Sequence, residues 1–389
     1  MLNVELIETM DGLRALEEAW ETLWIKDSTA DIFTSFDWFL NWWEHFGNGT
    51  ERSTHELHDD HNLIGIGGKD ARLHVILVRD KGELIGIAPL ILLRGQWRRC
   101  PARILAPPLN SHAPRSGIVL TCNPKEAIAA IVNFLSKSKA WDVMLLDGIS
   151  QRSGVIAAFR NEITRMGLKT YESSPWHHSY IAFDGTWEQY LAQKSRNFRQ
   201  QMRRSERSLE IMGALRVECF DKPETIDIGL RLFMEIDGES WKARAGESLA
   251  LNTTIGAYYA DLARQCVKKS HCQIWVLRVS GEPASAFLCL RDDRTLYTIK
   301  TSSKEKFASN ACSPGSTLIA HIFKDIWESE LNGLDFVGRI MFSERWASEI
   351  RGFEQLVVYN NHLYSSIINC FEEIKRKIQG YRKAGFTQN

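Results

Sequence analysis

Hydrophobic and polar positions follow the same order twice along the chain. In each half, two apolar runs flank a short polar turn that contains glycine, Lys81-Gly82-Glu83 in the first half and Ser280-Gly281-Glu282 in the second. The flanking runs are 73–79 and 84–93 in the first half, and 273–279 and 283–291 in the second. Apolar runs on both sides of such a turn predict a β-hairpin at each place.

Each predicted hairpin is followed by a strand, a helix and a short strand. These elements are expected at 116–121, 125–139 and 141–147 in the first half, and at 295–301, 315–330 and 333–337 in the second. The repetition predicts a duplicated α/β unit with mixed, mainly antiparallel sheets flanked by helices. A length of 389 residues also favours two domains. We place the boundary near Asp184-Gly185, which gives domains 1–183 and 184–389.

Four further helices are expected from polar and apolar periodicity. They span Thr186 to about Met212, 224–242, 253–269 and 363–382. The last of them has Ile367, Ile368, Phe371, Ile374 and Ile378 on one face.

Charge balance, hydropathy and cysteine spacing limit the classes of protein to which the chain can belong. The 48 basic and 48 acidic residues cancel, so a polyanionic partner would need a local basic patch. No run of about 20 apolar residues is present, and no basic segment followed by an apolar stretch opens the sequence, so we expect no membrane insertion and no signal peptide. The eight cysteines show no CxxC spacing, which favours a reducing cytoplasm.

The segment Ser313-Pro314-Gly315-Ser316-Thr317 opens an amphipathic helix and is a candidate anion site. Serine is a favoured N-cap, proline a favoured first helical residue, and glycine lets a ligand approach the backbone. Unpaired N–H groups and the positive end of the helix attract an anion such as a pyrophosphate. Segments of this kind also start many helices that bind nothing. Thr298 and Lys300, on the strand that leads into this loop, complete the predicted donor site.

The order hairpin, strand, glycine-containing loop, helix and short strand resembles the acyl-CoA-binding core of GNAT proteins. More closely, the chain resembles the BioF2-like/CelD acetyltransferase family, relatives of the FemABX aminoacyl transferases. The segments that carry this resemblance are Trp20-Glu21-Thr22-Leu23-Trp24, Phe36-Asp37-Trp38-Phe39, Lys194-Ser195-Arg196-Asn197-Phe198-Arg199, Glu239-Ser240-Trp241-Lys242, Ser313-Pro314-Gly315-Ser316 and Leu334-Asp335-Phe336-Val337-Gly338. Together they extend over nearly the whole chain.

The resemblance implies two GNAT-like domains, of which the first is structural or shapes the acceptor site and the second is catalytic. It also implies transfer of an acyl group from acetyl-CoA or another acyl-CoA to an amine. The usual Gln/Arg-x-x-Gly-x-Gly/Ala loop of GNAT proteins is reduced here to Gly315. An acyl carrier protein or an aminoacyl-tRNA is therefore an alternative donor.

Chemistry of this type needs a base for the amine and an acid for the leaving thiolate. Asp237 and Glu239 are the predicted bases, because in the resembled fold their helix borders the acceptor cleft. Asp335 is a rival base or a buried carboxylate that holds a turn. In enzymes of the resembled kind a tyrosine often serves as the acid. The segment 339–351 contains no tyrosine, so Tyr297, or Tyr359 as the alternative, would have to take this role.

Two further groups of residues are candidate ligand contacts, and a third group is considered as a metal site. Trp241 and Lys242 lie beside the predicted bases in the sequence and could form a wall of the acceptor pocket. Arg196, Arg199, Arg203 and Arg207 form a helical stripe that could hold a donor phosphate or a tRNA backbone, or could be a solvated face. His55, His58 and His61 do not have the apolar support of a metal site, so no metal is expected.

The sequence thus predicts an N-acyltransferase that acts on an amine of a small molecule or sugar by direct transfer from acyl-CoA in a ternary complex. Two alternatives remain. One is a FemABX-like transferase that uses aminoacyl-tRNA. The other is a non-catalytic relative that binds acyl-CoA or a partner protein.

Overall fold

The structure is a computed structural model that describes residues 2–47, 71–97, 100–108, 110–121, 124–172 and 175–386, with side chains described as far as 374. The chain forms two compact units. The first contains Met1–Trp176 and Gly352–Asn389, and the second contains His177–Arg351. The structure therefore divides the chain differently from the boundary expected near 184. Residues after 351, expected in the second domain, belong to the first unit.

The sheet of the first unit has the strand order β1-β2-β3-β4-β6-β14. These strands are β1 (Asn3–Ile7), β2 (Arg72–Asp80), β3 (Glu83–Trp97), β4 (Cys100–Ala106), β6 (Val143–Ser150) and β14 (Glu349–Tyr359). Two short strands, β5 (Val119–Leu120) and β7 (Lys169–Glu172), pair with β3 and β14 respectively. All neighbours are antiparallel except β4 and β6, which are parallel.

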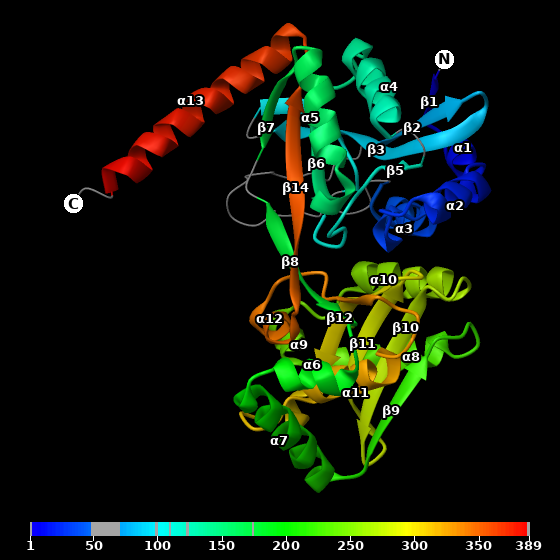
Figure 1. The fold of residues 1–389 in the computed structure, drawn as a ribbon, viewed down its shortest axis with the longest axis vertical. Coiled ribbons are helices and arrows are strands. Elements are labelled where there is room, and N and C mark those ends of the chain that lie inside the picture. Colours follow the sequence, from blue (N-terminus) through cyan, green and yellow to red (C-terminus); the bar gives the residue numbers. More distant parts are fainter. Residues whose placement is uncertain are drawn as a thin grey trace. The chain divides into compact units, whose positions relative to one another are not determined.

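Helices α4 (Pro124–Lys137) and α5 (Val155–Arg165) bury apolar residues on this sheet (Figure 1). Ile128, Ile131 and Phe159 belong to the same buried cluster as Leu356 and Val358 of β14. The N-terminal helices are α1 (Met10–Arg14), α2 (Glu17–Lys26) and α3 (Phe36–Trp42), and the last helix is α13 (Leu363–Phe386).

The sheet of the second unit has the order β9-β10-β11-β12-β13-β8. The strands are β9 (Leu215–Phe220), β10 (Cys272–Val279), β11 (Glu282–Arg291), β12 (Thr295–Ser303), β13 (Gly333–Asp335) and β8 (Trp176–Ala182). Only β12 and β13 are parallel. This is the pairing pattern of the first unit, strand for strand.

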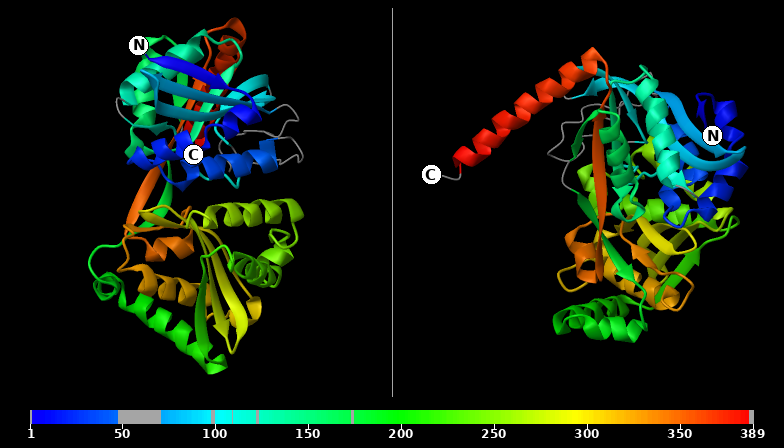
Figure 2. Two further views of the ribbon diagram at one scale, coloured as in Figure 1. Left: turned by 90° about the vertical axis from the view of Figure 1, so that its right-hand side faces the viewer. Right: turned by 45° about the horizontal axis from the view of Figure 1, so that its top comes forward.

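Helices cover both faces of the second sheet (Figure 2). On one face lie α8 (Ile226–Gly238) and α10 (Thr253–Val267), and on the other lie α7 (Arg196–Met212) and α11 (Pro314–Ile326). Three shorter helices are α6 (Trp187–Gln193), α9 (Trp241–Ala245) and α12 (Met341–Trp346). The core between the sheet and α11 includes Phe287, Leu318, Ile322 and Phe323.

The last strand of each sheet comes from a different half of the sequence than the other five strands, which we call the exchange of strands. In the first sheet β6 pairs with β14, which comes from the C-terminal part of the chain, and in the second sheet β13 pairs with β8, which comes from the middle. Leu356 and Val358 of β14 are fully buried in the core of the first unit, which explains why the residues after 351 belong there. The predicted fold class is confirmed, and the predicted duplication is visible as one strand order used twice.

Two predicted elements differ from the structure. The third strand of the first unit is β4 at 100–106, whereas 116–121 contributes only the short β5. The long helix predicted from Thr186 to Met212 is two helices, α6 and α7. Ser195 has an extended backbone and caps α7 through its hydroxyl, which accepts from the Phe198 amide, so the helix restarts there.

Candidate functional site

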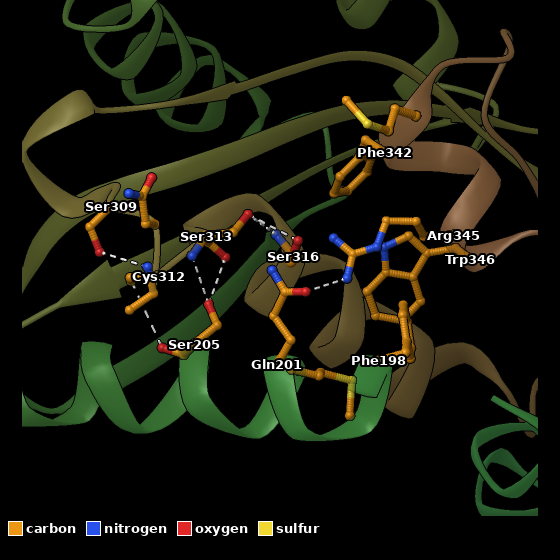
Figure 3. Close-up of a pocket in the computed structure, with 14 residues that line it drawn as sticks. Phe198, Gln201, Ser205, Ser309, Cys312, Ser313, Ser316, Phe342, Arg345 and Trp346 are labelled. Atoms are coloured by element: carbon orange, nitrogen blue, oxygen red, sulfur yellow. Dashed lines mark hydrogen bonds between the residues drawn. The ribbon is translucent and has the colours of Figure 1, made fainter. Parts of the chain in front are cut away.

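A cavity of about 270 Å³ lies at the start of α11 (Figure 3). Its walls come from three places in the second unit: α7, the loop 309–313 with the first turn of α11, and α12. Phe198, Met202, Phe342 and Trp346 make much of the lining apolar, while Gln201, Ser313, Ser316 and Arg345 supply polar groups. An apolar cavity with a few polar groups is typical of a small-molecule site.

The first turn of α11 forms the way the sequence predicts. Ser313 is the N-cap, and its hydroxyl accepts from the Ser316 amide at 3.3 Å and donates to the Ser316 hydroxyl at 2.9 Å. Pro314 follows as the first helical residue. The hydroxyls of Ser313 and Ser316 therefore stand together in the cavity wall.

Helix α7 is fixed against this turn by Ser205, which is buried. The Ser205 hydroxyl accepts from the Ser313 amide at 2.8 Å and lies 3.1 Å from both the Ser313 carbonyl oxygen and the Thr317 hydroxyl. Two amides of this turn, those of Ser313 and Ser316, are thus already paired within the protein. The cavity offers an anion mainly hydroxyl groups and one guanidinium, rather than the row of unpaired amides expected from the sequence.

That guanidinium belongs to Arg345, a residue that sequence reasoning missed. It is exposed on α12, donates to Gln201 at 2.5 Å and lies 5.6 Å from the centre of the Phe198 ring. Its place beside Ser316 results from the packing of α12 on α7, where Phe198 and Trp346 meet edge to face at 4.8 Å. No spacing in the sequence connects residues 198, 316 and 345.

Strand β12 changes its pairing partway along its length. Leu288 pairs with Lys300 and Cys289 with Thr298, so Ile299 is an extra residue that forms a β-bulge. On the other side, β13 pairs with β12 only from Thr295 to Tyr297, although β12 continues to Ser303. The described strands therefore leave the second half of β12 without a partner on that side.

The predicted donor residues are not all at the cavity. Ser313 and Ser316 line it, whereas Pro314 and Thr317 are buried beneath the turn. Gly315 faces the sheet, because a Cβ there would lie 3.5 Å from the Ser303 hydroxyl and 4.0 Å from Phe287. Thr298 is also buried.

Lys300 lies on the opposite face of the sheet from the cavity, against α10. Its amine is 4.9 Å from the centre of the Tyr259 ring. Burial, followed by repulsion from Lys242, lowers the pKa of Lys300 to about 8. Lys242 donates to the Thr301 carbonyl oxygen, and burial lowers its pKa as well. Trp241, at the start of α9, is 54% exposed.

Asp237, a predicted base, is a buried structural carboxylate. One oxygen accepts from the Ser248 hydroxyl at 2.8 Å and from the Leu249 amide at 2.6 Å, and the other accepts from the Ser302 hydroxyl at 2.8 Å. The side chain is almost fully buried. These contacts connect α8 to the loop before α10 and to β12, and they keep the carboxylate away from solvent.

The remaining predicted catalytic residues are also engaged elsewhere. Glu239 accepts from Lys304 at 2.8 Å in a cluster that includes Glu235 and Glu282. Asp335 is buried, lies 3.4 Å from His178, and accepts from the Val337 amide at 2.7 Å, so it holds a turn in which Val337 has a φ of 53°. The Tyr297 hydroxyl donates to Asp292 at 2.7 Å. The alternative acid, Tyr359, is buried in β14 of the first unit.

The arginine stripe divides into two parts. Arg199 donates to the carbonyl oxygens of Leu191, Ala192 and Lys194 and so caps the C-terminal end of α6. Arg203 and Arg207 are exposed, and together with Arg204 they line a shallow groove on the outer surface of α7. Arg199 is structural, whereas Arg203 and Arg207 are open to solvent.

Within the described ranges, no group of three or more His, Cys, Asp or Glu residues is arranged to hold a metal ion. His55, His58 and His61 lie outside the described residues. Among the helices described, none combines the length and the apolar character needed to cross a bilayer.

The cavity lies in a segment with a recognisable sequence family. Residues 196–346 match the family model described as the acetyltransferase (GNAT) domain, and the whole cavity lining falls within this range. No curated protein matches the chain.

Solved structures share the fold of most of the chain. A crystal structure of FemX is 12% identical and has a TM-score of 0.56, over 90% of this chain and 96% of that one. A conserved protein of unknown function from Bacteroides thetaiotaomicron is 10% identical, with a TM-score of 0.53 over 92% of this chain and all of the other. The C-terminal domain of a putative lysylphosphatidylglycerol synthetase from Agrobacterium fabrum is also 10% identical, with a TM-score of 0.51 over 92% and 96% of the two chains. At sequence identities of 10–12%, the similarity between these structures and this chain is a similarity of fold.

The segment that forms the cavity is therefore similar in sequence to acetyltransferase domains. Residues 196–346 of the second unit match the GNAT acetyltransferase domain, and most of the chain has a fold shared with FemX. The resemblance inferred from the sequence is confirmed at this level.

Proposed function

We propose that the chain is an N-acyltransferase that moves an acyl group from acyl-CoA to an amine by direct transfer in a ternary complex, in the manner of the BioF2-like/CelD family. The observation that carries the proposal is the cavity at the start of α11. It lies wholly within the GNAT segment and combines an apolar lining with Ser313, Ser316 and Arg345. Hydroxyl groups and a guanidinium can both donate hydrogen bonds to the diphosphate of such a donor.

In the proposed reaction the amine nitrogen attacks the thioester carbonyl carbon of the donor. A C–N bond forms, the C–S bond breaks, and the proton lost by the amine is balanced by the proton gained by the leaving thiolate. Asp237, Asp335 and Tyr297 are held in other contacts. We therefore assign most of the rate enhancement to the positioning of donor and acceptor. On the side away from β11, the part of β12 after Tyr297 has no described strand beside it and offers backbone groups for that positioning.

Arg345 provides the test of this proposal, because its guanidinium is exposed at the cavity and donates only to Gln201 among the contacts described. Arg345→Ala should raise the dissociation constant of acetyl-CoA by about 10-fold, equivalent to about 1.4 kcal/mol. Calorimetric titration of acetyl-CoA into the full chain measures this. Arg264→Ala is the matched control, since Arg264 is half-exposed on α10 and pairs with Asp227 and Asp261. Equal affinities for the wild type and both variants would place the donor elsewhere.

A FemABX-like transfer from aminoacyl-tRNA is the second candidate. The exposed groove with Arg203, Arg204 and Arg207 on α7 favours it, because a row of guanidinium groups can follow a phosphate backbone. Release of free thiol from acyl-CoA in the presence of amines would support the first candidate. Consumption of aminoacyl-tRNA without thiol release would support the second. Binding of either donor without turnover would indicate a non-catalytic relative.

A further inference from the structure

Helix α13 has an apolar face that the described part of the chain does not cover. Leu363, Ile367, Phe371 and Ile374 are 79%, 42%, 62% and 57% exposed. Their spacing of three or four residues puts them on one side of the helix. Figures 1 and 2 show α13 running outward from the end of β14, away from the sheet of its own unit. Four large apolar side chains in one exposed row are unusual for a helix that packs only on its own protein.

The opposite side of the same helix is anchored to the first unit. The Ser365 hydroxyl is buried and donates to the Asp142 carbonyl oxygen at 2.8 Å, and Ile368 is fully buried. Glu372 is also buried and accepts from the indole N–H of Trp97. The first three turns of α13 are therefore fixed in one orientation, with the apolar row facing outward.

The sequence continues this pattern with basic residues. Ile378 follows Ile374 by four residues in the sequence, and the stretch after Ile374 contains Lys375, Arg376, Lys377, Arg382 and Lys383 but no acidic residue up to the end of the sequence given. This stretch carries five positive charges, whereas the full chain has a net charge of zero. It is the local basic patch that a polyanionic partner would require.

The charges favour one occupant of the apolar row. A second copy of the helix, paired in parallel along the same row, would bring the two basic stretches 375–383 side by side, and like charges disfavour such a parallel pair. A surface of anionic lipid satisfies both features at once, since the apolar row enters the acyl boundary while the flanking cations meet the headgroups.

We propose that α13 docks the protein on an anionic phospholipid surface through Leu363, Ile367, Phe371 and Ile374, with the basic stretch 375–383 bound to the headgroups. The helix lies in the interface and does not cross the bilayer. Because Ser365 and Glu372 tie the helix to the first unit, the bound helix holds that unit close to the surface.

The test is sedimentation of the full chain with vesicles. One vesicle type is pure phosphatidylcholine, and the other contains phosphatidylglycerol in addition. The protein should bind the anionic vesicles and not the neutral ones, and binding should weaken as salt rises. The double variant F371S/I374S should lower the partition coefficient by at least about 10-fold, and K375E/K377E should do the same.

The control is I211S, because Ile211 is 87% exposed on α7, outside the proposed surface. Thermal unfolding of each variant checks that the fold is retained, which is expected because all the changed apolar residues are exposed. Two results would overturn the proposal. One is a failure of the wild type to bind anionic vesicles. The other is a dimer in solution that F371S/I374S dissociates, which would show that a second copy covers the row.

Discussion

At the scale of single residues, the structure separates acidic groups that look alike in the sequence. Asp237 and Asp227 both lie on α8, but Asp237 is buried against three hydrogen-bond donors while Asp227 is exposed and pairs with Arg264. The donors to Asp237 come from residues 248, 249 and 302, and no short-range pattern in the sequence brings them together. Asp237, which the sequence suggested as a base, therefore connects α8, the loop before α10 and β12 through hydrogen bonds.

Asp237→Ala should therefore lower the free energy of unfolding by about 2–4 kcal/mol, because two hydroxyls and one amide lose a charged partner in a buried site. Asp227→Ala should change it by less than about 0.5 kcal/mol, since an exposed ion pair contributes little. Urea unfolding of the two variants measures both values. An Asp237→Ala protein that keeps its stability but loses transferase activity would restore this residue as the base.

At the scale of elements, two glycines that look equivalent in the sequence differ in their surroundings. Gly315 in the first turn of α11 has room for a methyl group, with the nearest atom, the Ser303 hydroxyl oxygen, at 3.5 Å. Gly333 at the start of β13 has none, because a Cβ there would collide with the Ile181 carbonyl oxygen and the Tyr180 hydroxyl. Gly333 is thus required by the close approach of β8 to β13.

Gly315→Ala should leave the stability unchanged or raise it by up to about 1 kcal/mol, because alanine loses less backbone freedom than glycine in a helix. Gly333→Ala should lower the stability by about 1–3 kcal/mol through overpacking. Thermal unfolding distinguishes the two. The same Gly315→Ala protein should bind acetyl-CoA as the wild type does, because this glycine faces the sheet. Loss of affinity without loss of stability would place the donor against Gly315 after all.

The elements themselves were largely predictable from local pattern. Both hairpins, the strand 295–301 and the helix after Ser313 appear where apolar periodicity and capping residues place them. Two errors have the same physical origin. Strand β4 at 100–106 was missed because its sequence, with Pro101 and Arg103, lacks a long apolar run. The break at Lys194–Ser195 was missed because Arg199 closes the end of α6 from the next helix. In both cases, contacts between different elements determine the local structure more than the local sequence does.

At the scale of the whole molecule, the sequence indicated the duplication but not the exchange of strands. Each half of the sequence contains five of the six strands of one sheet, and the sixth comes from the other half. The apolar residues of β14 would suit an edge next to either β6 or β13, because both strands are mostly buried. Similarly, Arg345 joined the candidate site only through the packing of α12 on α7. The linear order of the elements therefore indicated the duplicated strand order, whereas the strand that ends each sheet depends on long-range pairing.

The exchange makes the boundary between the units testable with two fragments. A fragment of residues 177–351 contains every residue of the second unit, including most of β8, and should unfold cooperatively with native-like circular dichroism.

A fragment of residues 184–389 follows the boundary expected from the sequence. It lacks β8, so β13 loses the neighbour that pairs at Gly333, Leu334 and Asp335. It also carries β14 without β6, which leaves Leu356 and Val358 uncovered. We expect this longer fragment to aggregate or to unfold without a cooperative transition, because an unpaired apolar strand is an aggregation site. If 184–389 were the stable fragment and 177–351 the unstable one, β14 would belong to the second unit and the exchange of strands would be wrong.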